Sequence, residues 1–115
     1  LYVEDLETGV IIQLTNDGSR KRINGTFDWA YEEEFFCRDG FRWSPDSRKI
    51  AFWQINAGVT RDYYMLNATD SIYPQVIPVE YPVAGEKPST YRIGVVDINK
   101  SSTRWMQIPD DPTWG

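Results

Sequence analysis

Residues 41–56 read FRWSPDSRKIAFWQIN, which is the pattern of a β-hairpin. We expect strands over Phe41–Trp43 and Lys49–Ile55, because bulky apolar residues recur in both segments. The intervening Ser44–Ser47 contains the Pro and Asp that favour a tight turn. Three side chains of the second strand are expected on one face: Ile50, Phe52 and Gln54.

The rest of the chain repeats this alternation of strands and turns. Leu1–Asp5 and Val10–Thr15 predict a second hairpin around a turn at Glu7–Gly9, and a further turn is expected at Asn16–Gly18. Turn-rich stretches separate four more strand candidates, which are Arg61–Leu66, Val76–Val79, Tyr91–Ile98 and Thr103–Ile108. The sequence therefore predicts an all-β fold.

A weak internal repeat relates the two ends of the chain. VEDL at residues 3–6 recurs as VVDI at 95–98, and QLTNDG at 13–18 recurs as QIPDD at 107–111. The first two strings lie 92 residues apart, about two of the roughly 40–45-residue units of a propeller blade. We therefore expect about two blades of a β-propeller. Two blades cannot close a ring, so the chain is expected to be part of something larger, or to pair with other chains.

Composition excludes several classes of function. The 115 residues carry a formal net charge of −5, which argues against binding nucleic acid. Histidine is absent and Cys37 is the one cysteine, so the chain cannot hold a Ser-His-Asp triad, an intramolecular disulfide or a zinc site of several Cys and His ligands. No cofactor and no metal are expected. No apolar run approaches the roughly 18–20 residues that span a bilayer.

Residues 28–36, DWAYEEEFF, place three consecutive glutamates among aromatic residues. We predict a short helix over Trp29–Phe36 with Asp28 as its N-cap, and aromatic side chains that hold it against the strands. Adjacent carboxylates repel one another, which suggests that a cation offsets their charge. The alternatives are a solvated helix start that the helix dipole stabilises, a calcium site that includes Asp39, and a glycosidase carboxylate pair. The calcium site is disfavoured because the alternating spacing of oxygen ligands is missing. The glycosidase pair is disfavoured because adjacent glutamates on one short helix are poorly placed to flank a bond from opposite sides.

This stretch resembles the D-W-x-Y-E-E-E segment of the dipeptidyl peptidase IV family. The similarity continues through residues 41–56 and through YPQVIPVEYPVAGEKPSTYRIGVVD at 73–97, and it covers roughly residues 1–108. It implies an N-terminal region that is part of an eight-bladed propeller, with a short helix that carries the glutamates. It also implies that Glu33 and Glu34 bind the α-amino group of a peptide with a free N-terminus, and that the parent removes Xaa-Pro or Xaa-Ala dipeptides.

The resemblance also implies where the catalytic residues lie and which residues of this chain support the glutamates. The family's catalytic Ser, Asp and His belong to a C-terminal α/β-hydrolase domain, so no catalytic residue is expected here. Glu32, Tyr31 and Trp29 are candidate supporting residues, and Glu32 is expected to be structural. The sequence does not choose among three arginines for contact with the substrate carbonyl, which are Arg20, Arg22 and Arg38.

Two further expectations concern the whole protein. The parent is expected to be exported and is a candidate homodimer. The alternative reading is a non-catalytic propeller segment whose carboxylates bind a basic partner protein. The loop at residues 81–90 is rich in Pro and Gly and is expected to be a connection.

Overall fold

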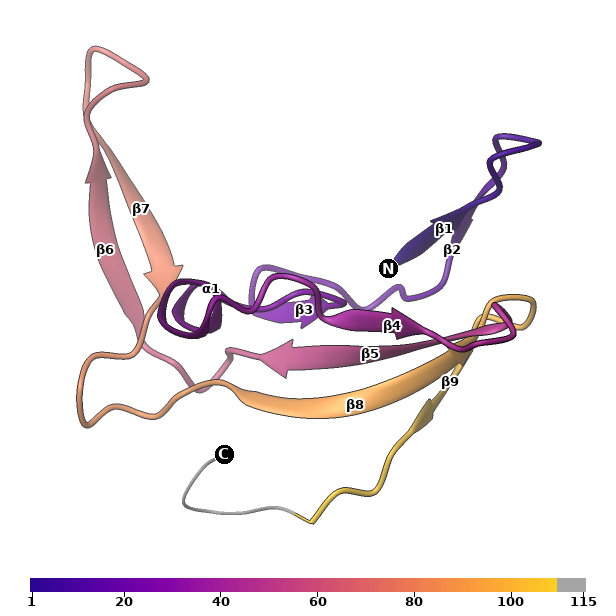
Figure 1. Ribbon diagram of the computed structural model, residues 1–115. Coiled ribbons are helices and arrows are strands. Elements are labelled where there is room, and N and C mark those ends of the chain that lie inside the picture. Colours follow the sequence, from indigo (N-terminus) through magenta and orange to yellow (C-terminus); the bar gives the residue numbers. More distant parts are fainter. Residues whose placement is uncertain (110–115) are drawn as a thin grey trace.

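The computed structural model describes residues 1–109, which form antiparallel strands and, within that range, one short helix (Figure 1). The predicted all-β class is confirmed. The elements are β1 (Tyr2–Glu4), β2 (Ile11–Gln13), β3 (Arg22–Asn24), α1 (Trp29–Phe35), β4 (Phe41–Trp43), β5 (Lys49–Asn56), β6 (Asp62–Asn67), β7 (Gln75–Glu80), β8 (Thr90–Asp97) and β9 (Ser102–Trp105).

Strand β5 organises the central sheet. On one side it pairs with β8 along its whole length, from Lys49 opposite Asp97 to Asn56 opposite Thr90, and β9 follows β8. On its other side β3 pairs with residues 54–56 and β4 with residues 50–52. Strands β3 and β4 therefore lie end to end and occupy one strand position, so the sheet is four strands wide.

Helix α1 is inserted between β3 and β4, and two glycines close the insertion at its base. The Gly40 N–H donates to the Gly25 carbonyl at 3.1 Å, and both residues are bonded to the backbone of Trp53 in β5. A Cβ on Gly40 would lie 2.8 Å from the carbonyl carbon of Gly25. Only glycine permits this approach, so the chain leaves the sheet and returns to it at the same point, with α1 projecting between.

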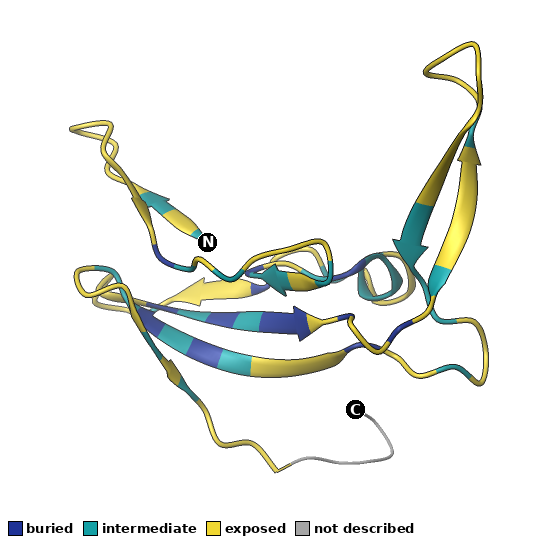
Figure 2. Cartoon of the chain, turned by 180° about the vertical axis from the view of Figure 1, so that it is seen from behind, coloured by how far each residue is buried: buried dark blue, intermediate teal, exposed yellow. Residues whose placement is uncertain are grey.

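The core lies on one face of the sheet, as the sequence predicts. Ile50, Phe52 and Gln54 are 2%, 1% and 3% exposed, which confirms that they share the inward face. Ile50 and Phe52 pack with Leu14 and Val96. Figure 2 shows that the buried residues are concentrated in β5 and β8, whereas the two hairpins that project from the sheet are mostly exposed.

A polar network extends the core at Gln54. Its amide nitrogen donates to Asp17 Oδ2 at 2.9 Å and to Asn24 Oδ1 at 2.7 Å, and its Oε1 accepts from Arg92 Nε at 2.8 Å. The Arg92 guanidinium lies 3.5 Å from the centre of the Trp105 ring, a cation–π contact. The buried side-chain amide of Gln54 is thereby satisfied at both its nitrogen and its oxygen.

Most predicted strands are present. The β1–β2 and β4–β5 hairpins are confirmed, and both strings of the internal repeat begin antiparallel hairpins, β1–β2 and β8–β9. Strand β9 ends at Trp105, three residues before the predicted end. The PDD part of the repeat reaches residues 110 and 111, outside the described residues.

One local prediction is wrong, and one strand is missing from the predicted set. The expected turn at Asn16–Gly18 does not form, because Asp17 is held by Asn24 and Gln54, and the chain turns instead at Ser19–Arg22. Strand β3 was not predicted, and its residues RIN are extended because they pair with β5.

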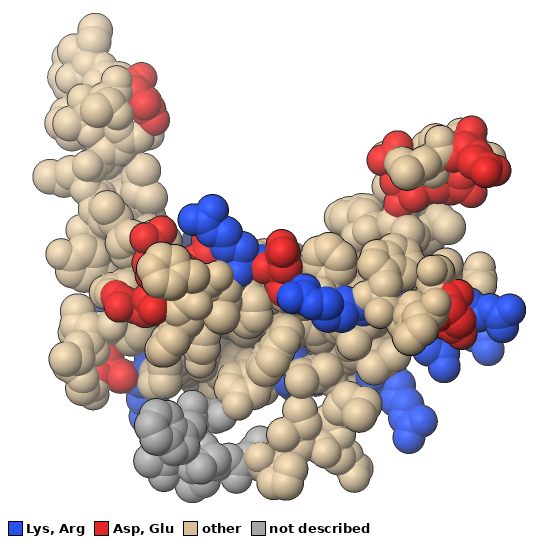
Figure 3. Space-filling view, in the orientation of Figure 1, with Lys and Arg blue, Asp and Glu red and all other residues tan. Residues whose placement is uncertain are grey.

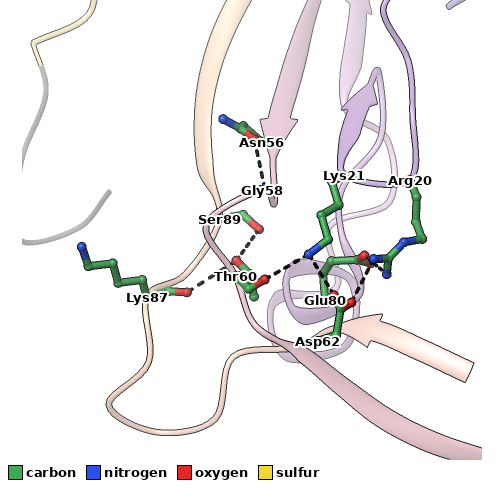
Figure 4. A network of polar contacts seen from close by, with 9 residues as sticks. All are labelled: Arg20, Lys21, Asn56, Gly58, Thr60, Asp62, Glu80, Lys87 and Ser89. Atoms are coloured by element: carbon green, nitrogen blue, oxygen red, sulfur yellow. Dashed lines mark hydrogen bonds and ion pairs between the residues drawn. The ribbon is translucent and has the colours of Figure 1, made fainter.

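The β6–β7 hairpin projects from the sheet and is anchored at its base by charged residues (Figure 4). Asp62 and Glu80 face each other across the two strands, and Arg20 pairs with both. Lys21 Nζ lies 3.0 Å from Asp62 Oδ1 and 3.4 Å from the Thr60 carbonyl oxygen. The repulsion between the two carboxylates is thereby offset, and the hairpin is fixed to the segment that precedes β3.

Within the described residues no helix is long and apolar enough to cross a membrane.

Candidate functional site

Helix α1 begins where the sequence predicts. Asp28 is extended, with φ −77° and ψ 171°, and its carboxylate accepts a hydrogen bond from the Tyr31 N–H at 3.0 Å. This is the N-cap arrangement. At the other end Phe36 adopts a left-handed conformation, with φ 56°, and the Cys37 N–H donates to the Tyr31 carbonyl at 3.2 Å. The helix therefore ends at Phe35, one residue earlier than predicted.

The N-cap residue of the helix is buried and hydrogen-bonded. Asp28 is 3% exposed, and its second carboxylate oxygen accepts from the hydroxyl of Ser89. The Ser89 hydroxyl lies 3.3 Å from that of Thr60, which is also buried. These contacts fix α1 to the segments before β6 and β8, so its glutamates project from a rigid support.

The three glutamates differ in their surroundings. Glu32 is half-buried in the first turn, whereas Glu33 and Glu34 are exposed near the C-terminal end of the helix. None of the three forms an ion pair with any residue in the described part of the chain. Figure 3 shows acidic side chains where α1 meets the base of the β6–β7 hairpin. The site therefore presents negative charge without a matching cation among residues 1–109.

Tyr81 contacts both ends of the helix. Its hydroxyl donates to Glu34 Oε1 at 2.5 Å, and its ring lies against the Trp29 ring with 4.8 Å between centroids. The hydrogen bond to the Glu34 carboxylate raises the pKa of Tyr81 above its usual value of 10.0. Tyr81 therefore remains a hydrogen-bond donor at any physiological pH.

An aromatic cavity of about 590 Å³ lies beside Glu34. Its aromatic lining residues are Phe27, Tyr31, Phe35, Trp53, Tyr81 and Tyr91. All of these rings except Tyr81 form a continuous series, in which Phe27 lies 6.1 Å from Tyr31 and 5.9 Å from Trp53 between ring centroids. Burial is the largest influence on Tyr31 and raises the pKa of its hydroxyl. The site thus combines one carboxylate with a large apolar surface.

The structure brings only part of the predicted set to this cavity. Tyr31 and Glu34 line it, whereas Glu32, Glu33 and Trp29 do not. Phe35 and Phe36 were expected to hold the helix against the strands, but they are 68% and 83% exposed. That prediction is wrong for Phe36, which serves as the left-handed C-cap. Phe35 contacts the Tyr31 ring and lines the cavity.

None of the three candidate arginines forms an ion pair with the glutamates of α1 within residues 1–109. Arg20 is paired with Asp62 and Glu80, and Arg22 lies 3.7 Å from Asp17. Arg38 is exposed, and its backbone carbonyl accepts a hydrogen bond from the Thr26 hydroxyl. No group of three or more His, Cys, Asp or Glu side chains in the described residues is arranged to hold a metal ion.

Sequence reasoning missed Tyr81. We expected the loop at residues 81–90 to be a connection, yet its first residue bonds to Glu34, and Pro82 and Pro88 line the cavity. The missed signal is the tyrosine itself, a large amphipathic side chain at the entrance to a Pro- and Gly-rich loop.

Comparisons with known proteins agree with this architecture. Residues 1–113 match the family model described as the dipeptidyl peptidase IV N-terminal region. A protein of Talaromyces marneffei named "Probable dipeptidyl-aminopeptidase B" is 32% identical over 88% of this chain, and the dipeptidyl-aminopeptidase B of Aspergillus niger is 28% identical over 96%. The alignments span only 13% and 14% of those two proteins.

A solved structure supports the same assignment. The crystal structure of Porphyromonas gingivalis dipeptidyl peptidase 4 superimposes with a TM-score of 0.87 and 31% sequence identity, covering 96% of this chain and 16% of that chain. The chain therefore belongs to the dipeptidyl peptidase IV family, as part of its N-terminal region. Its sheet and hairpins are part of the family's β-propeller, which confirms the predicted fold class.

Proposed function

We propose that this chain is part of the substrate-binding region of a serine-type dipeptidyl peptidase, in which Glu33 and Glu34 bind the α-ammonium group of the peptide. One observation carries the proposal. Two adjacent carboxylates project from a rigidly capped helix, and neither forms an ion pair among residues 1–109. The names of the relatives, dipeptidyl-aminopeptidases, agree with a ligand that has a free N-terminus.

The chemistry fits an ammonium group. It offers three donors, and two ionised carboxylates accept charge-assisted hydrogen bonds while the added charge relieves their mutual repulsion. Holding the terminus at a fixed point also places one particular peptide bond at the nucleophile, so that binding energy is used for positioning. That fixed distance accounts for the release of dipeptides. Cleavage after Pro or Ala in the second position is proposed from the resemblance to the family.

The nucleophile must come from elsewhere in the protein. The 115 residues contain no histidine, so they cannot complete a Ser-His-Asp triad. We assign that role to a C-terminal α/β-hydrolase domain of the parent, with this segment supplying recognition only. Glu32, half-buried in the first turn, supports the helix.

The test uses the full-length natural protein with Gly-Pro-chromophore and its N-acetylated counterpart. We expect hydrolysis of the free amine alone. Glu33→Gln and Glu34→Gln should each lower kcat/KM at least about a hundredfold, roughly 2.7 kcal/mol, because a charge-assisted contact is lost. Glu7→Gln, at the exposed tip of the β1–β2 hairpin, is the matched control. Equal rates in the wild type and in both variants would disprove amine binding by this pair.

A second candidate function is protein binding without catalysis. The observation that favours it is the β6–β7 hairpin, where Leu66, Ile72 and Tyr73 are 73%, 95% and 81% exposed. An isolated two-stranded hairpin with exposed apolar side chains gains stability from contact with another protein. In this case neither chromogenic substrate is cleaved, and the carboxylates of α1 receive a basic partner instead.

A further inference from the structure

Glu33 and Glu34 are neighbours in sequence but not equivalent in the structure. Glu34 accepts a hydrogen bond from the Tyr81 hydroxyl, whereas Glu33 accepts none from any described residue. Glu34 is exposed, and an exposed glutamate samples several rotamers unless a contact selects one. The phenol occupies only Oε1, and a carboxylate can accept about four hydrogen bonds. Oε2 therefore remains available to a ligand while the group as a whole is held.

Tyr81 is itself held from two directions. Its ring packs on Trp29 in the first turn of α1, while its hydroxyl reaches Glu34 in the last turn, so the side chain lies along the helix. It directly follows Glu80, which is paired with Arg20 at the base of the β6–β7 hairpin. The donor is thus fixed by its ring and by the backbone before it, and it reaches a glutamate 47 residues away in the sequence.

From these contacts we propose that Tyr81 is a positioning residue that orients Glu34 toward the ammonium group of the substrate. The inference rests on the proposed function and deepens it: Tyr81 acts through Glu34 and does not itself contact the substrate. The chemical reason is that the phenol O–H gives the carboxylate one defined orientation before the ligand arrives. The ligand then does not have to restrict that side chain on binding. The raised pKa of Tyr81 agrees with this, because the donor stays protonated at every pH at which a peptidase would work.

The experiment is a double-mutant cycle in the full-length natural protein, with Glu34→Gln, Tyr81→Phe and the two combined. We expect Tyr81→Phe to lower kcat/KM about tenfold, mainly through a higher KM, since one hydrogen bond to a charged group is lost. In the Glu34→Gln background the same change should have no further effect. Tyr2→Phe is the matched control, because its side chain is exposed and no hydrogen bond to its hydroxyl occurs among the described residues.

A second readout requires no catalysis. The phenol titration of Tyr81 is isolated by subtracting the ultraviolet titration of each Tyr81→Phe variant from that of its parent. The pKa of the Tyr81 phenol obtained in this way should fall toward its usual value of 10.0 when Glu34 is replaced by Gln. An unchanged titration means that the contact is absent and overturns the inference.

The outcomes separate the inference from the proposal beneath it. If Glu34→Gln leaves kcat/KM unchanged, Glu34 does not bind the amine and the positioning role fails. The proposed function fails as well if Glu33→Gln also leaves kcat/KM unchanged. If Glu34→Gln impairs the enzyme but Tyr81→Phe does not, only the positioning role fails. Losses that add in the double variant also overturn it, because a residue that acts through Glu34 cannot contribute once that carboxylate is gone.

Discussion

The carboxylate of Asp28 and the hydroxyl of Ser89, 61 residues apart in the sequence, are hydrogen-bonded in the interior of the protein. They are 3% and 1% exposed. Asp28 also caps the helix that carries the glutamates, and Ser89 directly precedes β8. One carboxylate therefore has two roles, in which it starts the helix and fixes it to the central sheet.

Asp28→Ala should destabilise the protein more than the loss of a surface carboxylate would. It removes an N-cap, typically about 1 kcal/mol, and leaves the buried Ser89 hydroxyl without its acceptor, a further cost of about 1–3 kcal/mol. We expect a loss of about 2–4 kcal/mol in the free energy of unfolding, measured by urea titration of the natural chain. Asp39→Ala, an exposed carboxylate without a side-chain hydrogen bond among residues 1–109, is the control. Equal midpoints in the two variants would contradict this role of Asp28.

The helix illustrates what can be predicted from local sequence. An Asp before an aromatic and acidic run determines where α1 begins, and the alternation of Ile50 and Phe52 determines which face of β5 is buried. Both signals act over a few residues. Neither requires knowledge of what lies elsewhere in the chain.

The missed features all depend on partners distant in sequence. Strand β3 is extended because β5 supplies its hydrogen bonds, and Asp17 leaves its predicted turn because Gln54 and Asn24 bind its carboxylate. Tyr81 belongs to the site only because the β6–β7 hairpin returns the chain to α1. From the sequence the site could be located at the glutamates, but not the residue that orients one of them.

The base of the β6–β7 hairpin should loosen in acid. The hydrogen bond from Arg20 is the largest cause that holds the pKa of Asp62 below its usual 3.8. A carboxylate whose pKa is lowered in the folded state adds stability above its unfolded pKa, and this is lost as the pH falls through the folded value. We therefore expect amide exchange in β6 and β7, corrected for the intrinsic pH dependence, to remain slow at pH 5 and to accelerate only below pH 3.8.

The matched variants for that measurement are Arg20→Gln and Arg61→Gln. Arg20→Gln should move the onset of rapid exchange to higher pH, because Asp62 loses the donor that keeps it ionised. Arg61 pairs with Glu86 at an exposed position, so its replacement should leave the hairpin unchanged. An identical onset in wild type and Arg20→Gln would show that Arg20 does not hold the hairpin.

Gly40→Ala should disturb the glutamates without touching them. The added Cβ would lie 2.8 Å from the Gly25 carbonyl carbon and 2.9 Å from the Thr26 nitrogen. Both are backbone atoms that cannot rotate away, so we expect a loss of about 1–3 kcal/mol in unfolding free energy. Since these residues close the base of the segment that carries α1, kcat/KM for free-amine substrates should also fall in the full-length protein.

The control is Gly18→Ala, where the nearest atom to the new Cβ is 3.9 Å away, and it should change neither the unfolding free energy nor kcat/KM. If Gly40→Ala were as stable and as active as Gly18→Ala, the close contact of Gly40 with Gly25 and Thr26 would not be what holds the helix in place.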